Sequence, residues 1–302
     1  MSRVVLAAGV AACLVVIAGC QAPRDDVALV LASPAVVARS ERLDKALADH
    51  DSNSAGPTTL AQWRLPAALK EISGLALTSD GRLLAHDDEV GAVWEIDYRR
   101  GVVLKRFSLG GGIVKGDFEG ITVAHDMVYL LTSTSKLYEF QEGANDARVK
   151  YIIHDLGLKE QCEFEGVAFD PTLNALLLAC KHVHNKALQG ELVIYRWSLT
   201  DTTGARLSTL SVPLAKVIGA NGWKGLHPSD ITIDPLTGNY VLIASLEKAI
   251  VSITPAGAVV FARPLPPGHD QPEGVAITKD GVLIISDEAR LLPALMTLYR
   301  WP

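Results

Sequence analysis

The chain has 302 residues, 49% of them hydrophobic, and a formal net charge of −6. This length can bury a large core and is compatible with one all-β domain or with a two-domain chain. The acidic balance lacks the basic footprint of nucleic-acid-binding proteins, so we expect no nucleic-acid partner.

The first element in chain order is an export signal, predicted over residues 1–19. Arg3 precedes an apolar stretch from Val4 to Ala18, which is too short to cross a bilayer comfortably as a helix. The stretch ends in Ile17-Ala18-Gly19-Cys20, which resembles the lipobox of bacterial lipoproteins. That resemblance implies a mature chain that begins at Cys20 and is held on a membrane by diacylglycerol and a palmitate-type acyl chain. The alternative is an ordinary signal peptide with a chance cysteine.

A flexible linker is predicted over residues 20–58. The segment is rich in Ala, Ser and Asp and ends in a run of chain-breaking residues from Asp51 to Pro57. A short helix over Val36–Ala48 is compatible with this composition. Gln21 follows the cysteine, and because no Asp stands there, resemblance to sorted lipoproteins favours the outer membrane. We therefore expect a lipid-anchored protein of the cell envelope that faces the periplasm.

From residue 59 to 302 the chain consists of short β-rich runs bounded by Gly, Asp, Asn and Pro, which is an all-β pattern. Five segments share a motif in which a glycine or its equivalent precedes an apolar strand: Glu71-Ile-Ser-Gly-Leu-Ala-Leu77, Asp117-Phe-Glu-Gly-Ile-Thr-Val123, Glu163-Phe-Glu-Gly-Val-Ala-Phe169, His227-Pro-Ser-Asp-Ile-Thr-Ile233 and Gln271-Pro-Glu-Gly-Val-Ala-Ile277. Their third positions lie 46, 46, 64 and 44 residues apart. This period matches one four-stranded blade, so we predict a β-propeller of five blades. The longest interval leaves six blades open.

The last repeat lacks a fourth strand, because the chain ends directly after the run Met296–Trp301. We predict that Leu60–Leu65 supplies the missing strand. The ring would then be closed by strands from both ends of the domain, which removes the exposed edges of an open sheet.

The motif predicts a ring of polar side chains at one mouth of the central channel. Alternate residues of a strand face the same way, so the first and third motif positions form two columns around the axis. The third position holds Ser73, Glu119, Glu165, Ser229 and Glu273, and the second strands return Asp87 to Glu89, Lys181, His182, Glu247, Asp287 and Glu288 to the same face. The mouth is therefore predicted to be strongly acidic, with the motif glycines allowing close backbone packing.

Converging carboxylates repel each other unless they are protonated or neutralised, and Ca²⁺ takes six to eight oxygen ligands from such groups. The predicted calcium ligands are Glu119, Glu165, Glu273, Asp87 and Asp230. Further candidates to line the mouth are Glu71, Asp117, Glu163, His182, His227 and Asp287. Zinc fits less well, since His182-Val-His184 offers only two ligands. The alternative is that the glutamates only hydrogen-bond neighbouring backbone amides.

Two cysteines are left for a disulfide in an oxidising compartment. Cys13 leaves with the signal and Cys20 takes the lipid, so Cys162 and Cys180 remain. They flank one predicted hairpin and should face each other within a residue or two. Two buried thiols are the alternative.

The repeats Glu71-Ile-Ser-Gly-Leu-Ala, Asp117-Phe-Glu-Gly-Ile-Thr and Glu163-Phe-Glu-Gly-Val-Ala resemble those of the SdiA-regulated family of exported bacterial β-propellers. The resemblance runs from about residue 60 to the end and implies a propeller with a calcium-binding centre and no established catalytic role. Similar repeats occur in phytase-esterase-like and gluconolactonase-like propellers. The fourth repeat departs from the pattern with Pro228-Ser229-Asp230, which argues against a symmetric ring of five carboxylates.

Three functions are compatible with these features. The first is a membrane-anchored, non-catalytic binding module whose Ca²⁺ holds an anionic small molecule. The second is a metal-dependent hydrolase of phosphate esters or lactones, in which a carboxylate or His182 moves protons, although no catalytic residue can be assigned. The third is a scaffold that docks a protein partner on the loops Lys181–Gly190 or Gly219–Leu226, the latter carrying Trp223.

Overall fold

The computed structural model describes residues 24–49, 59–201, 206–219, 221–290 and 292–302. The export signal and the lipidation site Cys20 lie outside these residues. Within them, no helix is both long enough and apolar enough to cross a membrane.

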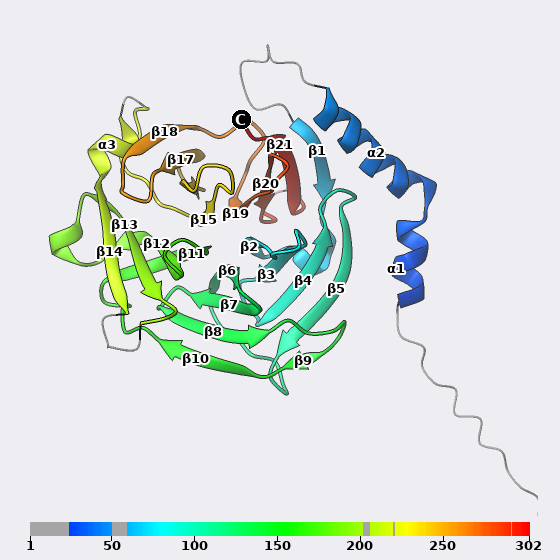
Figure 1. The fold of residues 1–302 in the computed structure, drawn as a ribbon, viewed down its shortest axis with the longest axis horizontal. Helices are drawn as coiled ribbons and strands as arrows, with labels where there is room; N and C mark the ends of the chain where they lie inside the picture. Colours follow the sequence, from blue (N-terminus) through cyan, green and yellow to red (C-terminus); the bar gives the residue numbers. More distant parts are fainter. Residues whose placement is uncertain (1–23, 50–58, 202–205, 220, 291) are drawn as a thin grey trace, which may run out of the picture.

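The strands form five sheets arranged around a central axis, which is a five-bladed β-propeller (Figure 1). Blade 1 contains β2 (Ile72–Leu77), β3 (Leu83–Asp87), β4 (Ala92–Asp97) and β5 (Val102–Leu109), with β9 (Arg148–Val149) added parallel to β5. Blade 2 contains β6 (Phe118–Ala124), β7 (Met127–Thr132), β8 (Lys136–Gln141) and β10 (Tyr151–Asp155). Blade 3 contains β11 (Cys162–Asp170), β12 (Ala175–Val183), β13 (Glu191–Ser198) and β14 (Leu207–Pro213). Blade 4 contains β15 (Asp230–Ile233), β16 (Tyr240–Ala244), β17 (Ala249–Ile253) and β18 (Val259–Pro264).

Blade 5 combines the two ends of the domain. Its strands β19 (Pro272–Ile277), β20 (Val282–Asp287) and β21 (Leu295–Arg300) come from the C-terminal end, and its outer strand β1 (Thr59–Arg64) comes from the N-terminal end. Trp63 of β1 pairs with Met296 of β21 in an antiparallel ladder. The predicted closure by an N-terminal strand is therefore confirmed.

The count of five blades is confirmed, and the alternative of six is wrong. The longest interval, the third, contains no further blade among its described residues. Its extra residues form the 3₁₀ turn η2 (Lys186–Leu188), the short helix α3 (Leu214–Ile218) and the loop that leads to β15.

Each pair of neighbouring blades shares one buried apolar cluster. The cluster between blades 5 and 1 includes Leu83 and Ile284, and the cluster between blades 2 and 3 includes Leu131 and Phe164. Equivalent clusters lie between blades 1 and 2, 3 and 4, and 4 and 5. Every blade thus buries both of its faces against its neighbours, which is what the near-continuous apolar runs of the inner strands require.

The segment predicted as a flexible linker contains two helices, α1 (Arg24–Leu31) and α2 (Pro34–Ala48). Helix α2 begins with a proline in its first turn and buries Val36 and Leu43, seven residues apart on one face. The guanidinium of Arg39 donates to the carbonyl of Arg100 at 2.9 Å, and α2 lies beside β1 in Figure 1. The short helix that the sequence allows over Val36–Ala48 is therefore present as part of α2.

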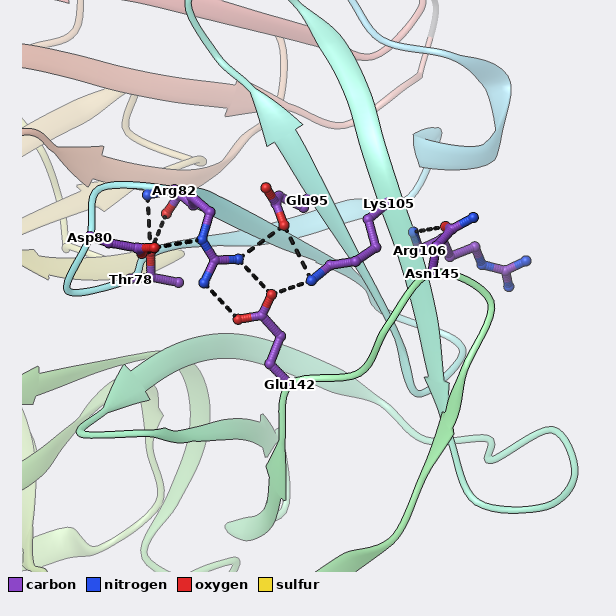
Figure 2. Close-up of polar contacts among 8 residues, drawn as sticks. All are labelled: Thr78, Asp80, Arg82, Glu95, Lys105, Arg106, Glu142 and Asn145. Carbon is purple, nitrogen blue, oxygen red and sulfur yellow. Dashed lines mark hydrogen bonds and ion pairs between the residues drawn. The ribbon is translucent and has the colours of Figure 1, made fainter. Parts of the chain in front are cut away.

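Blades 1 and 2 are also joined by a network of ion pairs (Figure 2). The guanidinium of Arg82, at the start of β3, donates to both oxygens of Glu142, at 2.5 and 2.9 Å. Lys105 contacts the same carboxylate, and Glu95 lies 3.0 Å from Arg82. The Arg82 hydrogen bond lowers the pKa of Glu142, so the pair is charged at neutral pH.

Candidate functional site

The third motif residue is lifted out of the strand ladder by a local bulge. In four of the five inner strands the pairing register shifts at this residue: between Ile72 and Gly74, Phe118 and Gly120, Phe164 and Val167, and Pro272 and Gly274. A bulge leaves its extra residue unpaired and re-aims the side chain. The sequence Glu-Gly therefore places a glutamate at the channel mouth in blades 2, 3 and 5.

The glycine of the motif brings neighbouring inner strands into close contact. A Cβ atom on Gly120 would lie 2.8 Å from the Cα of Gly166, and one on Gly166 would lie 2.7 Å from the Cα of Asp230. Any side chain at these two positions would collide with backbone. The prediction that these glycines serve close packing is confirmed, and the narrow ring they form is called the waist below.

Glu119, Glu165 and Glu273 interact with one another and with the ammonium group of Lys181, and Lys248 acts in addition on Glu273. Lys181 lies near the end of β12 and its Nζ forms an ion pair with Glu165, whose side chain is 6% exposed. We call the three glutamates and Lys181 the acidic mouth. Three carboxyls from three blades thus share the ammonium group of Lys181.

The ionisation of the acidic mouth is strongly perturbed. Burial, reinforced by Glu165, raises the pKa of Glu119 to about 9. Burial also raises the pKa of Glu165 to about 7, against the opposing effect of Lys181. The pKa of Glu273 is raised by burial as well. Glu119 therefore holds its proton at neutral pH and Glu165 is partly protonated there, because burial disfavours the charged forms.

A second group of carboxyls lies between blades 5 and 1. Burial and a hydrogen bond to Glu71 raise the pKa of Glu288 to about 8, which is the sign of a protonated carboxyl shared with a carboxylate. Gln271 donates to Glu288, and Lys70 lies 2.5 Å from Glu71. Burial also raises the pKa of the neighbouring Asp88 to about 6.

The fourth blade is built differently. Its third residue, Ser229, donates to the carbonyl of Pro272 at 2.7 Å. Asp230 stands where the other blades have glycine, is fully buried, and accepts the backbone N–H groups of Ile231 and Val275 at 2.8 Å each. Asp230, predicted as a calcium ligand, therefore lies at the waist with its oxygens directed at backbone amides.

The remaining predicted residues have local partners. Asp87 accepts the N–H groups of Glu89 and Val90, each at 3.1 Å, which caps the turn after β3. Asp117 accepts from Ser133, and Glu163 pairs across the hairpin with His182. These contacts hold the rim of the mouth.

Two histidine rings are in tilted contact at the rim between blades 3 and 4. The rings of His182 and His227 lie 4.9 Å apart, and the Nδ1 of His227 lies 2.7 Å from Glu247. Asp287 is buried, and its Oδ2 lies 2.6 Å from the Nδ1 of the buried His269.

A disulfide joins Cys162 and Cys180, the pair that the sequence left for a bridge, with Cα atoms 5.8 Å apart. It connects the mouth ends of β11 and β12, one residue before Lys181. The bridge therefore holds the strand end that carries the only cation of the acidic mouth.

The site residues that the sequence analysis placed at the mouth without naming them as ligands or lining candidates are Lys181, Glu288 and Asp88. All three stand at the ends of second strands, where they were expected to reach the mouth, and that position is the signal that could have identified them. Among the described residues, no three His, Cys, Asp or Glu side chains stand close enough together to hold a metal ion as they are. The calcium site stays a prediction.

No protein-family model matches the sequence, and no curated protein matches it. Among solved structures, an aldose sugar dehydrogenase from Streptomyces coelicolor shares 13% identity with a TM-score of 0.53, covering 81% of this chain and 98% of its own. The glutaminyl cyclase of Myxococcus xanthus shares 12% identity with a TM-score of 0.51, covering 80% of this chain and 95% of its own. A luciferin-regenerating enzyme shares 9% identity with a TM-score of 0.50, covering 82% of this chain and 98% of its own. These likenesses define the class of the molecule, a β-propeller protein, and at such identities they show the fold alone.

Proposed function

We propose that the protein is a membrane-anchored binding module of the cell envelope whose acidic mouth binds Ca²⁺. The observation that carries the proposal is the convergence of Glu119, Glu165 and Glu273 from three blades around Lys181. Buried carboxyls with raised pKa values gain most from a cation, because a cation relieves both their repulsion and their desolvation.

Binding of a calcium ion requires two local changes. The glutamates release their protons and draw together around the ion, and the Lys181 ammonium moves away from Glu165. The lysine has a flexible stem and its side chain is 31% exposed, so it can swing towards solvent. The affinity for Ca²⁺ should therefore rise with pH and should be limited by competition with this lysine.

An ion bound at this position would present its outer coordination sites to the open mouth. An anionic small molecule, such as a carboxylate or a phosphate ester, is the ligand that such an ion would hold. The anchor at Cys20, the outer-membrane location and the membership of the SdiA-regulated family belong to the same proposal. They rest on the sequence resemblances alone.

Calorimetric titration of the metal-stripped protein with Ca²⁺, Mg²⁺ and Zn²⁺ tests the calcium site. We expect saturable Ca²⁺ binding that becomes about tenfold or more weaker in Glu119→Gln and in Glu165→Gln. Glu139→Gln is the matched control, because that carboxylate pairs with His154 on the outer strands of blade 2. Absence of Ca²⁺ heat, together with no rise in melting temperature, would overturn the proposal.

A metal-dependent hydrolase is the second candidate, favoured by the histidine pair at the rim. Burial lowers the pKa of His182, so its imidazole is neutral and can accept a proton from water near a bound metal. Water would then add to the phosphorus or carbonyl centre while the leaving alcohol takes up a proton. Release of product from phosphate esters or lactones by the Ca²⁺-loaded protein, and its loss in His182→Gln, would establish this activity.

A further inference from the structure

A cavity of about 980 Å³ opens at the end of the propeller opposite to the acidic mouth. It is lined by the C-terminal halves of all five inner strands and by the turns that follow them. Its size falls in the range of about 300–1,000 Å³ that is typical of small-molecule sites. Nothing in the calcium proposal uses this space.

The wall of the cavity is apolar. The seventh motif residue of every repeat lines it, and these five residues are Leu77, Val123, Phe169, Ile233 and Ile277. All but Ile277 are only partly buried, so their side chains remain accessible from the cavity. The strand segments that line it contain no charged residue, and Thr122 and Thr232 are their only polar members.

The charged groups of the cavity are confined to the rim turns, where contacts hold Asp80 and Asp280 in place. Asp80 accepts from Thr78 and lies 2.9 Å from the Nε of Arg82, which continues into the ion-pair network of Figure 2. Asp280 accepts from Thr278 at 2.5 Å and lies 3.3 Å from Arg99. These contacts are made within the protein itself, so this part of the rim needs no ligand to take its shape.

The opposite side of the rim is apolar. Pro171 and Pro235 line the cavity in the turns of blades 3 and 4, and each turn exposes a leucine close by in the sequence. Leu173 is 45% exposed and Leu236 is 65% exposed. Apolar surface thus continues from the interior of the cavity to its edge.

The waist separates this cavity from the acidic mouth. Asp230 reaches from blade 4 to the backbone of Val275 in blade 5, and a backbone hydrogen bond from Leu75 in blade 1 also acts on it. The two ends of the channel are therefore distinct compartments with opposite chemistry.

From this arrangement we infer that the cavity is a binding site for a small, uncharged and largely apolar organic molecule. An ion would lose its hydration against the strand walls without gaining a charged partner, which makes charged ligands unfavourable there. An apolar body would cover the five seventh-position side chains, while a hydroxyl or carbonyl group could reach the threonines or the rim.

Titration with the neutral fluorescent probe N-phenyl-1-naphthylamine tests the inference. We expect a saturable rise in fluorescence with one probe per chain. The double variant Val123→Trp/Ile233→Trp fills the cavity and should weaken binding about tenfold or more. Val260→Trp adds an indole at a residue that is 51% exposed on β18 and should leave binding unchanged.

Circular dichroism establishes that each variant is folded. Should the double variant unfold, Val123→Asp places a charge at a partly exposed position of the wall and should abolish binding of the same probe. Non-saturable fluorescence, or equal affinity in the wild-type protein and a folded cavity variant, would overturn the inference. Glu119→Gln should bind the probe with the affinity of the wild type. The probe titration therefore tests the cavity even if the calcium site proves to be wrong.

Discussion

The two ends of the central channel are built by the same five inner strands and differ in nearly every chemical respect. At one end the third motif residues bring Glu119, Glu165 and Glu273 together around Lys181. At the other end the seventh residues form an apolar wall around the large cavity. Four positions along each strand are enough to change an acidic site into an apolar one.

The chemical difference between the two ends of the channel depends on the waist that separates them. The motif glycines let the strands approach closely, and the one residue there that is not glycine, Asp230, fills the centre. Without this closure, water could connect the acidic mouth to the apolar cavity.

The largest expected effect comes from Asp230→Ala. The change leaves the backbone N–H groups of Ile231, Val275 and Leu75 without their buried acceptor. An unsatisfied buried group costs about 1–3 kcal/mol, so we expect a loss of about 3 kcal/mol in the free energy of unfolding. Urea denaturation of the wild type and of the variant measures this loss of unfolding free energy.

Asp126→Ala is the control for that experiment, because Asp126 is exposed in a turn. Its effect should stay within about 0.5 kcal/mol. If Asp230→Ala unfolds at the same urea concentration as the wild type, the carboxylate does not hold the waist together.

A smaller effect is expected from the carboxyls of the mouth. The pKa is about 9 for Glu119 and about 7 for Glu165 in the folded protein, above the ordinary value of 4.5. Between about pH 4.5 and 9 the folded state holds protons that the unfolded chain has lost, so unfolding releases protons. The metal-free protein should therefore lose stability as the pH rises through this window.

Glu119→Gln removes the mouth carboxyl whose pKa, about 9, lies furthest above its ordinary value. Its melting temperature at pH 8 should exceed that of the metal-free wild type by about 2–4 °C, which corresponds to about 1 kcal/mol, while the two should be similar at pH 4.5. Differential scanning calorimetry at both pH values measures this. A pH-independent difference would show that the mouth carboxyls are not the cause.

The architecture could be predicted from the sequence because it depends on repetition. The spacing of the five motifs predicted the blade count, and the absence of a strand after Trp301 predicted that the ring closes through β1. Both inferences need only the period of the pattern and the rule that sheet edges must be covered.

The site could be predicted only in part, because its details depend on three-dimensional contacts. The columns of glutamates follow from strand alternation, but the ion pair between Lys181 and Glu165 depends on how a strand end is turned. The position of Asp230 at the waist follows from the close approach of glycine backbones, which one sequence does not reveal. The cavity depends on how far apart the five inner strands stand at that end of the channel, which the sequence does not reveal.

The most direct test of the account is the Ca²⁺ affinity of Lys181→Met. We infer that the Lys181 ammonium occupies the place that an added cation would take between Glu165, Glu273 and Glu119. Isothermal titration at pH 8 should then show Ca²⁺ binding about tenfold tighter than in the wild type. Unchanged or weaker Ca²⁺ binding in a folded Lys181→Met protein would contradict the claim that the acidic mouth is a cation site.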